Sequence, residues 1–295
     1  MQPDLQGIRI AVLGGDAREI LLVSELSRLG AHVQVVGLPV QGTENVTIYP
    51  DVQAALGNVQ AVILPVPGIN KDGTVYSIFT EQPLELSEKH LVSLPANTPV
   101  YAGFARERLA EMARRCNLKL VEVLKRDEVA ILNSIPSAEG AVQMAMEATP
   151  ITIHDSNSFV LGYGRTGATI ATLLKGMGAK VTVVARRDEH LARVYQLGMT
   201  PRNYAELPLV IKEADIVFNT VPALVLTNCI LSKASSEMVV IDVASPPGGT
   251  DFEAAKRFGI KALQAPGLPG KVAPKSAGRI LAQVIPRLLA EELFQ

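Results

Sequence analysis

Three glycines in the segment Gly-Tyr-Gly-Arg-Thr-Gly have the spacing of a turn that holds the phosphates of a dinucleotide. We expect Gly162 to allow a tight turn, Gly164 to let the backbone approach a pyrophosphate, and Gly167 to let a helix pack closely on a sheet. The N-terminus of that helix would offer free N–H groups and a positive dipole end to the phosphates. The other residues of the predicted site are Tyr163, Arg165 and Thr166.

The flanking sequence matters because glycine-rich turns are common. A buried strand is predicted at Ser158–Leu161, and a second strand begins at Lys180 after a helix that ends at Gly178. The apolar positions of that helix are Ala168, Ile170, Ala171, Leu173 and Leu174. This strand–turn–helix–strand order is the context in which the glycine pattern indicates dinucleotide binding.

The residues after the second predicted strand indicate which dinucleotide binds. NAD-binding folds usually place Asp or Glu about 20 residues after the last glycine, where it binds the ribose 2′-hydroxyl. Arg186 and Arg187 occupy this region, and two guanidinium groups would bind a 2′-phosphate well. We interpret Asp188, the nearest carboxylate, as the N-cap of the next helix. The pattern favours NADP(H) over NAD(H), with a solvated strand end as the alternative.

Length and composition favour a two-domain α/β protein. The chain has 295 residues, 48% hydrophobic and 4% aromatic with no Trp, which suits parallel sheets built from small aliphatic residues. A formal net charge of −1 provides no basic field, so nucleic-acid binding is not expected. Cysteines and histidines follow no metal-ligand spacing, and we expect no metal. No secretory signal or membrane span is recognisable, which predicts a cytoplasmic protein.

The first half of the chain predicts its own strand–turn–helix–strand unit. Ile8–Leu13 and His32–Val36 are expected strands on either side of a helix at Arg18–Leu29. Strands and helices continue to alternate, which predicts a parallel sheet. Gly15 is followed by Asp16, whose carboxylate would repel a pyrophosphate. We therefore interpret this half as a substrate domain and not as a second cofactor domain.

These patterns predict two Rossmann-like, doubly wound parallel-sheet α/β domains joined by a bridging helix, with a cleft between them. We expect a substrate domain over residues 1–133, a linker helix over 134–149 and an NADP-binding domain over 150–275. The last helix, over 276–295, is expected to pack back on the first domain.

Two segments are candidates for binding an anionic substrate. Ser134 and Ser137 lie at the expected N-terminus of the linker helix, where free N–H groups would bind a carboxylate. Simple helix capping is the alternative role. Lys271 and Lys275 lie in a loop rich in Pro and Gly and are candidate anion contacts, with ordinary surface lysines as the alternative.

Two predicted strand ends in the second half are further candidates, because ligands of open α/β sheets bind at the carboxyl ends of strands. Thr220, Val221 and Pro222 follow one strand, on the side where the nicotinamide normally lies. Asp242 ends the next strand, and Glu139 lies near the expected start of the linker helix; either carboxylate is a candidate general base. Ordinary turn chemistry is the alternative at both strand ends.

Six segments combine into a pattern more specific than the glycine turn alone. They are Ile10–Arg18, Arg126–Pro136, Gly162–Gly167, Gly248–Phe252, Ala265–Gly270 and Ala273–Ser276. Together they span nearly the whole chain, which resembles the dipicolinate synthase A subunits of spore-forming bacteria. The serine–proline linker and the Pro-Gly loop are also similar, more distantly, to those of methylenetetrahydrofolate and shikimate dehydrogenases.

The resemblance implies oxidation of dihydrodipicolinate to dipicolinate, with NADP⁺ as hydride acceptor, in the mother cell of a sporulating bacterium. It also implies a partner, the flavoprotein-like B subunit of the same synthase. A ring dicarboxylate needs anion sites, for which the candidates are Arg126, Ser134, Ser137, Lys271 and Lys275. The general base stays open among Asp242, Glu139 and a residue of the partner.

Two other functions are compatible with the same residues. One is another NADP-dependent dehydrogenase that acts on a small, shikimate-like carboxylate. The other is a non-enzymatic NADP(H)-binding regulatory subunit, because a glycine motif reports binding and not chemistry. The sequence also leaves self-association of the chain open.

Overall fold

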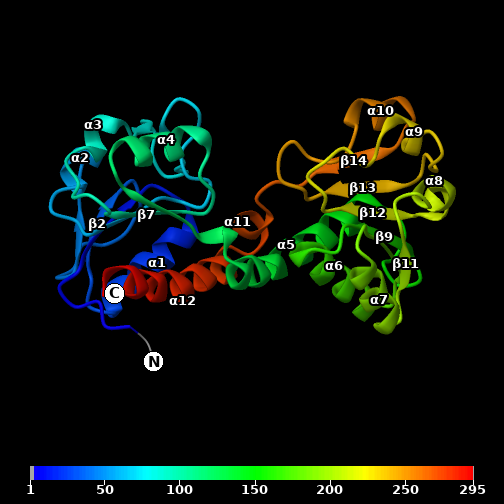
Figure 1. Ribbon diagram of the computed structural model, residues 1–295, viewed down its shortest axis with the longest axis horizontal. Helices are drawn as coiled ribbons and strands as arrows, with labels where there is room; N and C mark the ends of the chain where they lie inside the picture. The colour runs from blue at the N-terminus through cyan, green and yellow to red at the C-terminus, as the bar shows by residue number, and fades with distance from the viewer. Residues whose placement is uncertain (1–2, 295) are drawn as a thin grey trace. The chain divides into compact units, whose positions relative to one another are not determined.

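The computed structural model describes residues 3–294, which form two α/β units (Figure 1). Unit 1 contains the chain up to Ala130 and again from Pro274, and unit 2 contains Ile131–Ala273. The chain passes between the units inside helix α5 (Asp127–Ala148) and again just before helix α12 (Pro274–Leu293).

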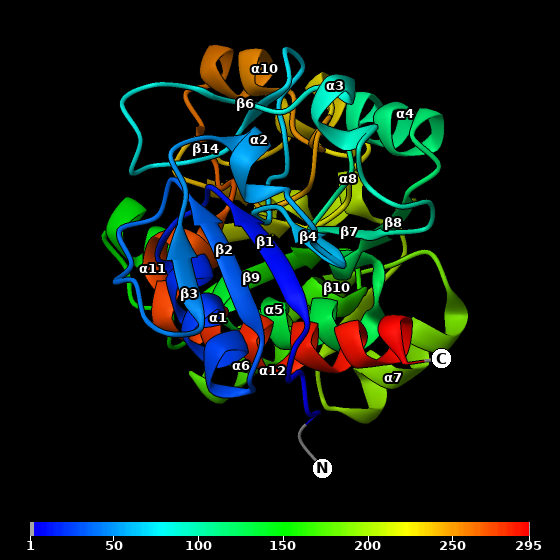
Figure 2. The same cartoon turned by 90° about the vertical axis from the view of Figure 1, so that its left-hand side faces the viewer.

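Unit 1 contains a six-stranded parallel sheet in the order β3-β2-β1-β4-β7-β8 (Figure 2). Its strands are β1 (Arg9–Leu13), β2 (His32–Val36), β3 (Val46–Ile48), β4 (Ala61–Ile63), β7 (Pro99–Ala102) and β8 (Lys119–Glu122). Its helices besides α12 are α1 (Ala17–Arg28), α2 (Val52–Ala55), α3 (Glu88–Leu91), α4 (Glu107–Arg115) and the 3-10 turn η1 (Val123–Lys125). A small antiparallel pair, β5 (Thr74–Val75) and β6 (Leu84–Glu85), lies outside the main sheet.

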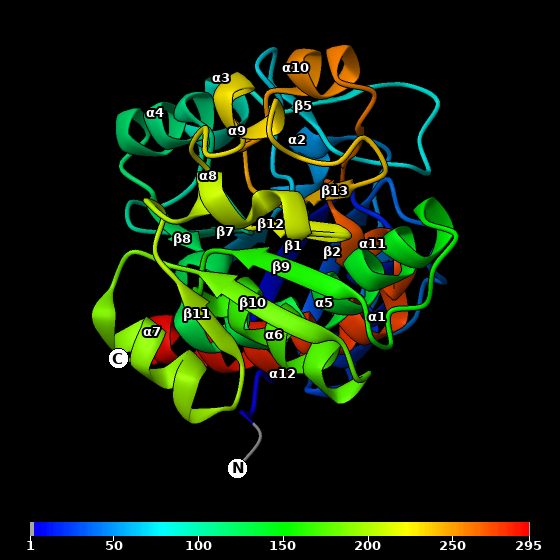
Figure 3. The same cartoon turned by 90° about the vertical axis from the view of Figure 1, so that its right-hand side faces the viewer.

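Unit 2 contains a second six-stranded parallel sheet in the order β11-β10-β9-β12-β13-β14 (Figure 3). Its strands are β9 (Asn157–Leu161), β10 (Lys180–Val184), β11 (Thr200–Arg202), β12 (Ile216–Asn219), β13 (Val239–Asp242) and β14 (Lys261–Gln264). Its helices besides α5 are α6 (Arg165–Gly176), α7 (Asp188–Gln196), α8 (Leu207–Val210), α9 (Asn228–Leu231), α10 (Phe252–Arg257), α11 (Leu268–Val272) and the 3-10 turn η2 (Ile211–Glu213).

Both sheets have the strand order of a Rossmann fold, in which the first strand of each unit lies in the middle. The central strands are buried runs of Val, Ile, Leu and Ala, as a parallel sheet requires. The predicted class of two doubly wound parallel-sheet domains is therefore confirmed. The strand order reverses between β1 and β4 in unit 1, and between β9 and β12 in unit 2. Such switch points are where ligands of these sheets bind.

Sequence patterns missed several short elements. The edge strands β3 and β11 have three residues each, too few for a hydrophobic pattern to stand out. The Pro-Gly segment predicted as a loop contains helix α11, which begins after Gly267 in the left-handed region at φ 67°.

Helix α12 belongs to unit 1, where it packs along α1. Its buried side chains recur at helical spacing, and the larger ones are Leu281, Val284, Ile285, Leu288 and Leu289. Gly278 makes the closest approach, because a Cβ built there would lie 3.1 Å from both the Cα and the carbonyl oxygen of Arg18. The two helix backbones can come this close only because position 278 carries no side chain.

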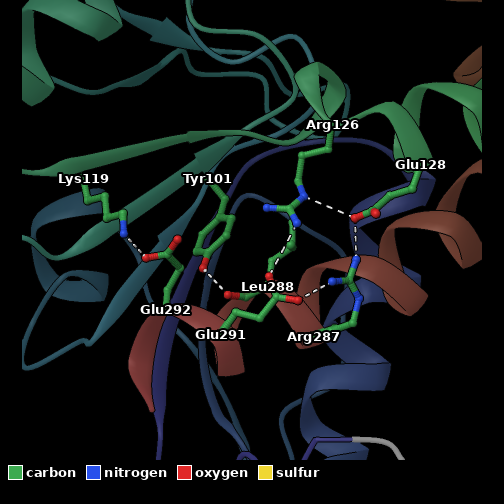
Figure 4. Close-up of polar contacts among 8 residues, drawn as sticks. All are labelled: Tyr101, Lys119, Arg126, Glu128, Arg287, Leu288, Glu291 and Glu292. Atoms are coloured by element: carbon green, nitrogen blue, oxygen red, sulfur yellow. Dashed lines mark hydrogen bonds and ion pairs between the residues drawn. The ribbon is translucent and has the colours of Figure 1, made fainter. Parts of the chain in front are cut away.

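Polar contacts fix the far end of α12 to the same unit (Figure 4). The Tyr101 hydroxyl donates to the Leu288 carbonyl at 3.1 Å, and burial raises the pKa of Tyr101. Arg287 contacts both Glu128 and Glu291. The network also contains Lys119, Glu292 and Arg126. Exposed ion pairs contribute at most about 1 kcal/mol each, so the apolar face of α12 dominates its attachment.

Replacing Gly278 with Val is expected to destabilise unit 1 by about 1–3 kcal/mol, because the new side chain meets the backbone of Arg18. Urea-dependent hydrogen exchange of the α1 amides measures this loss. Gly176→Val is the matched control, since a Cβ at this helical glycine meets nothing within 4 Å. Equal stability of the two variants would contradict the close packing of α1 and α12.

Candidate functional site

The glycine turn of unit 2 connects the end of β9 to the start of α6. Gly162 adopts φ +92°, and a Cβ there would lie 2.6 Å from the Thr220 hydroxyl oxygen. At Gly167 a Cβ would lie 2.2 Å from the carbonyl oxygen of Gly162. Both positions therefore need glycine for the fold of the chain itself.

Gly164 is different, because the fold does not explain it. Its φ of −83° is open to any L-residue, and a Cβ built there meets nothing within 4 Å. Gly164 is the N-cap of α6, and no side chain caps this helix end. The space beside Gly164 and the free helix N-terminus together fit the pyrophosphate of a dinucleotide. Arg165 and Thr166 form the first turn of α6 beside this space.

The strand next to β9 ends in the predicted arginine pair. Ala185 is buried, and its N–H donates to the Arg202 carbonyl at 3.0 Å. Arg186 and Arg187 follow and are exposed, and Arg187 rather than Asp188 is the N-cap of α7. Asp188 instead lies in the first turn of α7, where its charge still favours the helix dipole.

A third guanidinium lies at this edge, on a residue that sequence reasoning missed. Arg202 is the last residue of β11 and is in register with Val184 of β10. Its Nε lies 3.8 Å from a Glu206 carboxylate oxygen. Because three residues are too short a strand to recognise from sequence, nothing in the pattern placed Arg202 beside Arg186 and Arg187.

Tyr163 helps to hold the glycine turn against α7. Its ring contacts His190 in an edge-to-face arrangement with the ring centroids 5.7 Å apart. Burial raises the pKa of Tyr163, whose side chain is partly enclosed. Tyr163 therefore contributes packing to the turn and joins it to the helix that begins after the arginine pair.

The end of β12 supports the other side of the turn. The Thr220 hydroxyl donates to the Leu161 carbonyl at 2.8 Å, which ties β12 to the last residue of β9. The buried Asn219 accepts from the Val221 N–H at 3.1 Å and so shapes the turn that follows. Val221 is partly buried and Pro222 is exposed, so this strand end offers a surface beside Gly162.

Asp242, at the end of β13, holds a loop. Its carboxylate is 1% exposed and accepts hydrogen bonds from the Ala244 N–H at 3.0 Å, the Gly249 N–H at 3.1 Å and the Thr250 hydroxyl at 2.6 Å. Three donors and the lack of a solvent-facing surface leave it no free face for a substrate proton. This geometry assigns Asp242 to shaping residues 243–250 and disfavours it as the general base.

The predicted helix start at Ser134 and Ser137 is wrong. Helix α5 begins at Asp127, so both serines lie inside it, and their hydroxyls donate back to the carbonyls of Ile131 and Asn133. Ser134 is also buried and shares a 2.6 Å hydrogen bond with Thr169 of α6. Neither serine lies at a helix N-terminus, so neither lies beside the free helix N–H groups on which the carboxylate prediction is based.

The other predicted substrate residues are divided between the two units. Arg126 belongs to unit 1 and pairs with Glu128 at 3.2 Å and Glu291 at 3.5 Å (Figure 4). Glu139 is exposed on α5, opposite the C-terminal part of α6 and away from its N-terminus. The exposed lysines Lys271 and Lys275 lie in α11 and in the first turn of α12, so the chain carries them on different units.

The corresponding turn of unit 1 is filled by its own side chains. Asp16 caps α1 and accepts two hydrogen bonds from the Arg18 guanidinium, at 2.9 and 2.8 Å. Glu19 accepts from the Asp16 N–H at 2.8 Å, which completes a capping box. Two carboxylates thus occupy the helix end where a phosphate binds in dinucleotide domains.

Of the two carboxyl groups at this helix end, Glu19 has the more strongly shifted pKa. It is 1% exposed, and desolvation raises its pKa from 4.5 to about 7 in spite of the nearby Arg18. The pKa of Asp16 is lowered instead. Burial alone would raise it, but hydrogen bonds and the charge of Arg18 outweigh that effect.

Comparison with known proteins agrees with this geometry. Residues 133–242 match the NAD-binding domain of D-isomer specific 2-hydroxyacid dehydrogenases, and residues 9–124 match the N-terminal domain of the dipicolinate synthase A subunit. Escherichia coli D-lactate dehydrogenase shares the fold at 15% identity, with a TM-score of 0.68 over 98% of each chain. Unit 2 is thus a nicotinamide-dinucleotide-binding domain of the dehydrogenase type.

More similar relatives define the family. The dipicolinate synthase A subunit of Bacillus subtilis is 41% identical over 97% of each chain. The crystal structure of the same protein from Bacillus halodurans has a TM-score of 0.95 at 41% identity, covering 98% of this chain and 99% of that one. The chain belongs to the family of dipicolinate synthase A subunits.

Two further features, a membrane-spanning helix and a metal site, are absent from residues 3–294. In this part of the chain no helix is long and apolar enough to cross a membrane. The same residues contain no cluster of His, Cys, Asp and Glu that could hold a metal ion.

The glycine turn allows a paired test. Gly164→Val is expected to leave the thermal midpoint nearly unchanged, because its side chain enters open space, but to weaken dinucleotide binding at least about tenfold. Gly167→Val is expected to lower the thermal midpoint itself, because its Cβ meets the Gly162 carbonyl. Calorimetric titration and thermal unfolding measure the two effects. Full dinucleotide affinity of a folded Gly164→Val chain would remove the site from this turn.

Glu19 makes the stability of unit 1 depend on pH. Its pKa is raised on folding, so the folded chain binds more protons than the unfolded chain between about pH 4.5 and about pH 7. The free energy of unfolding therefore falls as pH rises through this window, by roughly 1–3 kcal/mol. Glu19→Gln should remove this fall, whereas Glu25→Gln, at a partly exposed position of α1 that pairs with Arg28, should not. Urea denaturation followed by exchange of the α1 amides gives the comparison; the same fall in both variants would contradict the assignment.

Proposed function

We propose that this chain is the NADP-dependent oxidising subunit of a dipicolinate synthase, acting in the mother cell of a sporulating bacterium. The observation that carries the proposal is the glycine turn, where Gly164 leaves open space beside an uncapped helix N-terminus. The family membership supports the substrate, since the relatives are named as dipicolinate synthase subunits.

The reaction removes one hydride and one proton from dihydrodipicolinate and leaves the aromatic dipicolinate ring. When bound, the cofactor accepts the hydride. The chain then has to hold the cofactor, orient the ring and accept the proton. Gly162, Gly164 and Gly167 serve the first task, with Thr220 and Val221 beside them.

We propose Lys271, which is exposed on unit 2, as a contact to a ring carboxylate, because Arg126 is paired and Ser134 is buried. Lys275, which is exposed on unit 1, stays a candidate for the same role. The proton acceptor remains a residue of this chain other than Asp242 or a residue of the partner subunit. That partner is proposed to be the flavoprotein-like B subunit of the synthase, in keeping with the names of the relatives.

We base the proposed cofactor preference on the arginines at the ends of β10 and β11. Arg186 and Arg187 are exposed past the end of β10, and Arg202 ends the neighbouring strand, so three arginines are available at the sheet edge where a 2′-phosphate is expected. NADP(H) should therefore bind at least about tenfold tighter than NAD(H), which corresponds to about 1.4 kcal/mol. Changing Arg186 to Asp and Arg187 to Ser should weaken or reverse the preference, and Arg202→Gln should reduce it less. Equal calorimetric affinities of the unaltered chain for both cofactors would contradict NADP selection.

The activity is tested by NADP⁺ reduction with dihydrodipicolinate, measured from NADPH absorbance with and without the partner subunit. Turnover is expected with this substrate and not with shikimate or other small carboxylates, because only the dihydro ring becomes aromatic on losing the hydride and proton. The Gly164→Val chain with the same partner is the control for turnover by this site. Turnover of a shikimate-like acid would favour the alternative dehydrogenase, and tight NADP(H) binding without any turnover would favour a regulatory subunit.

A further inference from the structure

An apolar groove lies on unit 2, between α5 and α6. Figures 1 and 3 show these two helices side by side, and the Ser134–Thr169 hydrogen bond joins them. The groove has a volume of about 390 Å³. Its walls are apolar and consist of Val142, Met146, Leu173 and Met177. We call it the α5–α6 groove.

The α5–α6 groove is separate from the dinucleotide turn. Leu173 and Met177 lie at the C-terminal end of α6, and nine residues of helix, about 13 Å, separate Leu173 from Gly164 at the other end. Nothing in the proposed reaction uses these side chains. Met146 is 56% exposed, so its side chain is accessible from solvent at the edge of the groove.

Acidic side chains border the groove at both ends. Glu139 and Glu147 lie two helical turns apart on α5, about 12 Å along its axis, with Met146 between them. Glu147 accepts a 2.9 Å hydrogen bond from Gln143, which orients its carboxylate along the rim. Among residues 3–294, neither Glu139 nor Glu147 forms an ion pair with a Lys or Arg.

The two carboxylates help to distinguish between a second copy of this chain and a different, positively charged partner as the occupant of the groove. In a two-fold pairing of α5 with α5 of a second copy, centred on Gln143, each Glu139 would face Glu147 of the other chain. Like charges placed opposite one another in an interface cost up to several kcal/mol, so the groove is poorly suited to its own copy. An apolar ridge with a cation on each side would instead fill the groove and pair both carboxylates.

We propose that the α5–α6 groove binds an amphipathic helix of the partner subunit, which places large apolar side chains in the groove and Lys or Arg near Glu139 and Glu147. This inference rests on the proposed function for the existence of that partner, and it adds where the partner docks. Methionines on both helices suit the role, because their flexible side chains adapt to the shape of a docked residue.

The test measures, with surface plasmon resonance, the affinity of the full-length chain for the purified partner subunit. Met146→Asp and the double variant Glu139→Lys, Glu147→Lys are each expected to weaken binding at least about tenfold, and added salt should weaken binding of the unaltered chain. Leu209→Asp is the matched apolar control, since Leu209 is 69% exposed elsewhere on unit 2. Glu213→Lys with Glu237→Lys is the matched charge control on exposed acids. NADPH titration of each variant verifies folding, because no substituted residue lies at the glycine turn.

The proposal is overturned if the groove variants bind the partner as tightly as the controls, or if the partner does not bind the chain at all. It is also overturned if Met146→Asp abolishes self-association of the chain in sedimentation and leaves partner affinity unchanged, since a second copy is then the occupant. Failure of the proposed function is a separate result: a complex that forms through the groove but does not reduce NADP⁺ supports this docking site and contradicts the activity.

Discussion

The candidate site depends on one close contact, in which α6 lies so near the end of β9 that only a hydrogen atom fits between Gly167 and the Gly162 carbonyl. This contact aims the N-terminus of α6 at the switch point of the sheet, where backbone N–H groups and the helix dipole attract phosphate. The Thr220 hydroxyl, bonded to Leu161, closes the other side of the same turn. Because three neighbouring elements meet here, the turn is rigid before any cofactor arrives, and little ordering has to accompany binding.

Unit 1 shows that this fold does not by itself leave an open helix N-terminus for a phosphate. Its sheet has the same strand order, and its first strand also ends at a turn with glycine in the left-handed region. There, however, Asp16 and Glu19 satisfy the helix N–H groups, and Arg18 neutralises the charge of Asp16. A phosphate would have to displace buried carboxylates that are already hydrogen-bonded. The two units therefore share a strand order but differ in what occupies the start of the first helix, which is filled by side chains in unit 1 and uncapped in unit 2.

Sequence reasoning succeeded where local geometry restricts the residue type. The roles of Gly162 and Gly167 and the alternating strands follow from steric limits and burial, which leave a clear pattern in the chain. It failed where the environment decides the role of a polar residue. Ser-x-Pro-Ser resembles a helix start, yet α5 continues through Pro136 because residues on both sides, such as Val129 and Ala138, are buried. Arg202 was missed for a related reason, since a three-residue edge strand has no periodicity.

The buried polar groups at the strand ends explain why the proton acceptor is hard to recognise. A carboxylate that is removed from solvent must be paired or hydrogen-bonded, and Asp242 meets this requirement by binding the loop that follows it. The same three hydrogen bonds hold the carboxylate against this loop, and Asp242 is only 1% exposed, so a bound ring would have little access to it. A group that accepts a proton during turnover needs the opposite condition, with few internal partners and access to the ring. A proton acceptor within unit 2 is therefore expected among the side chains that the fold leaves exposed and without internal hydrogen bonds.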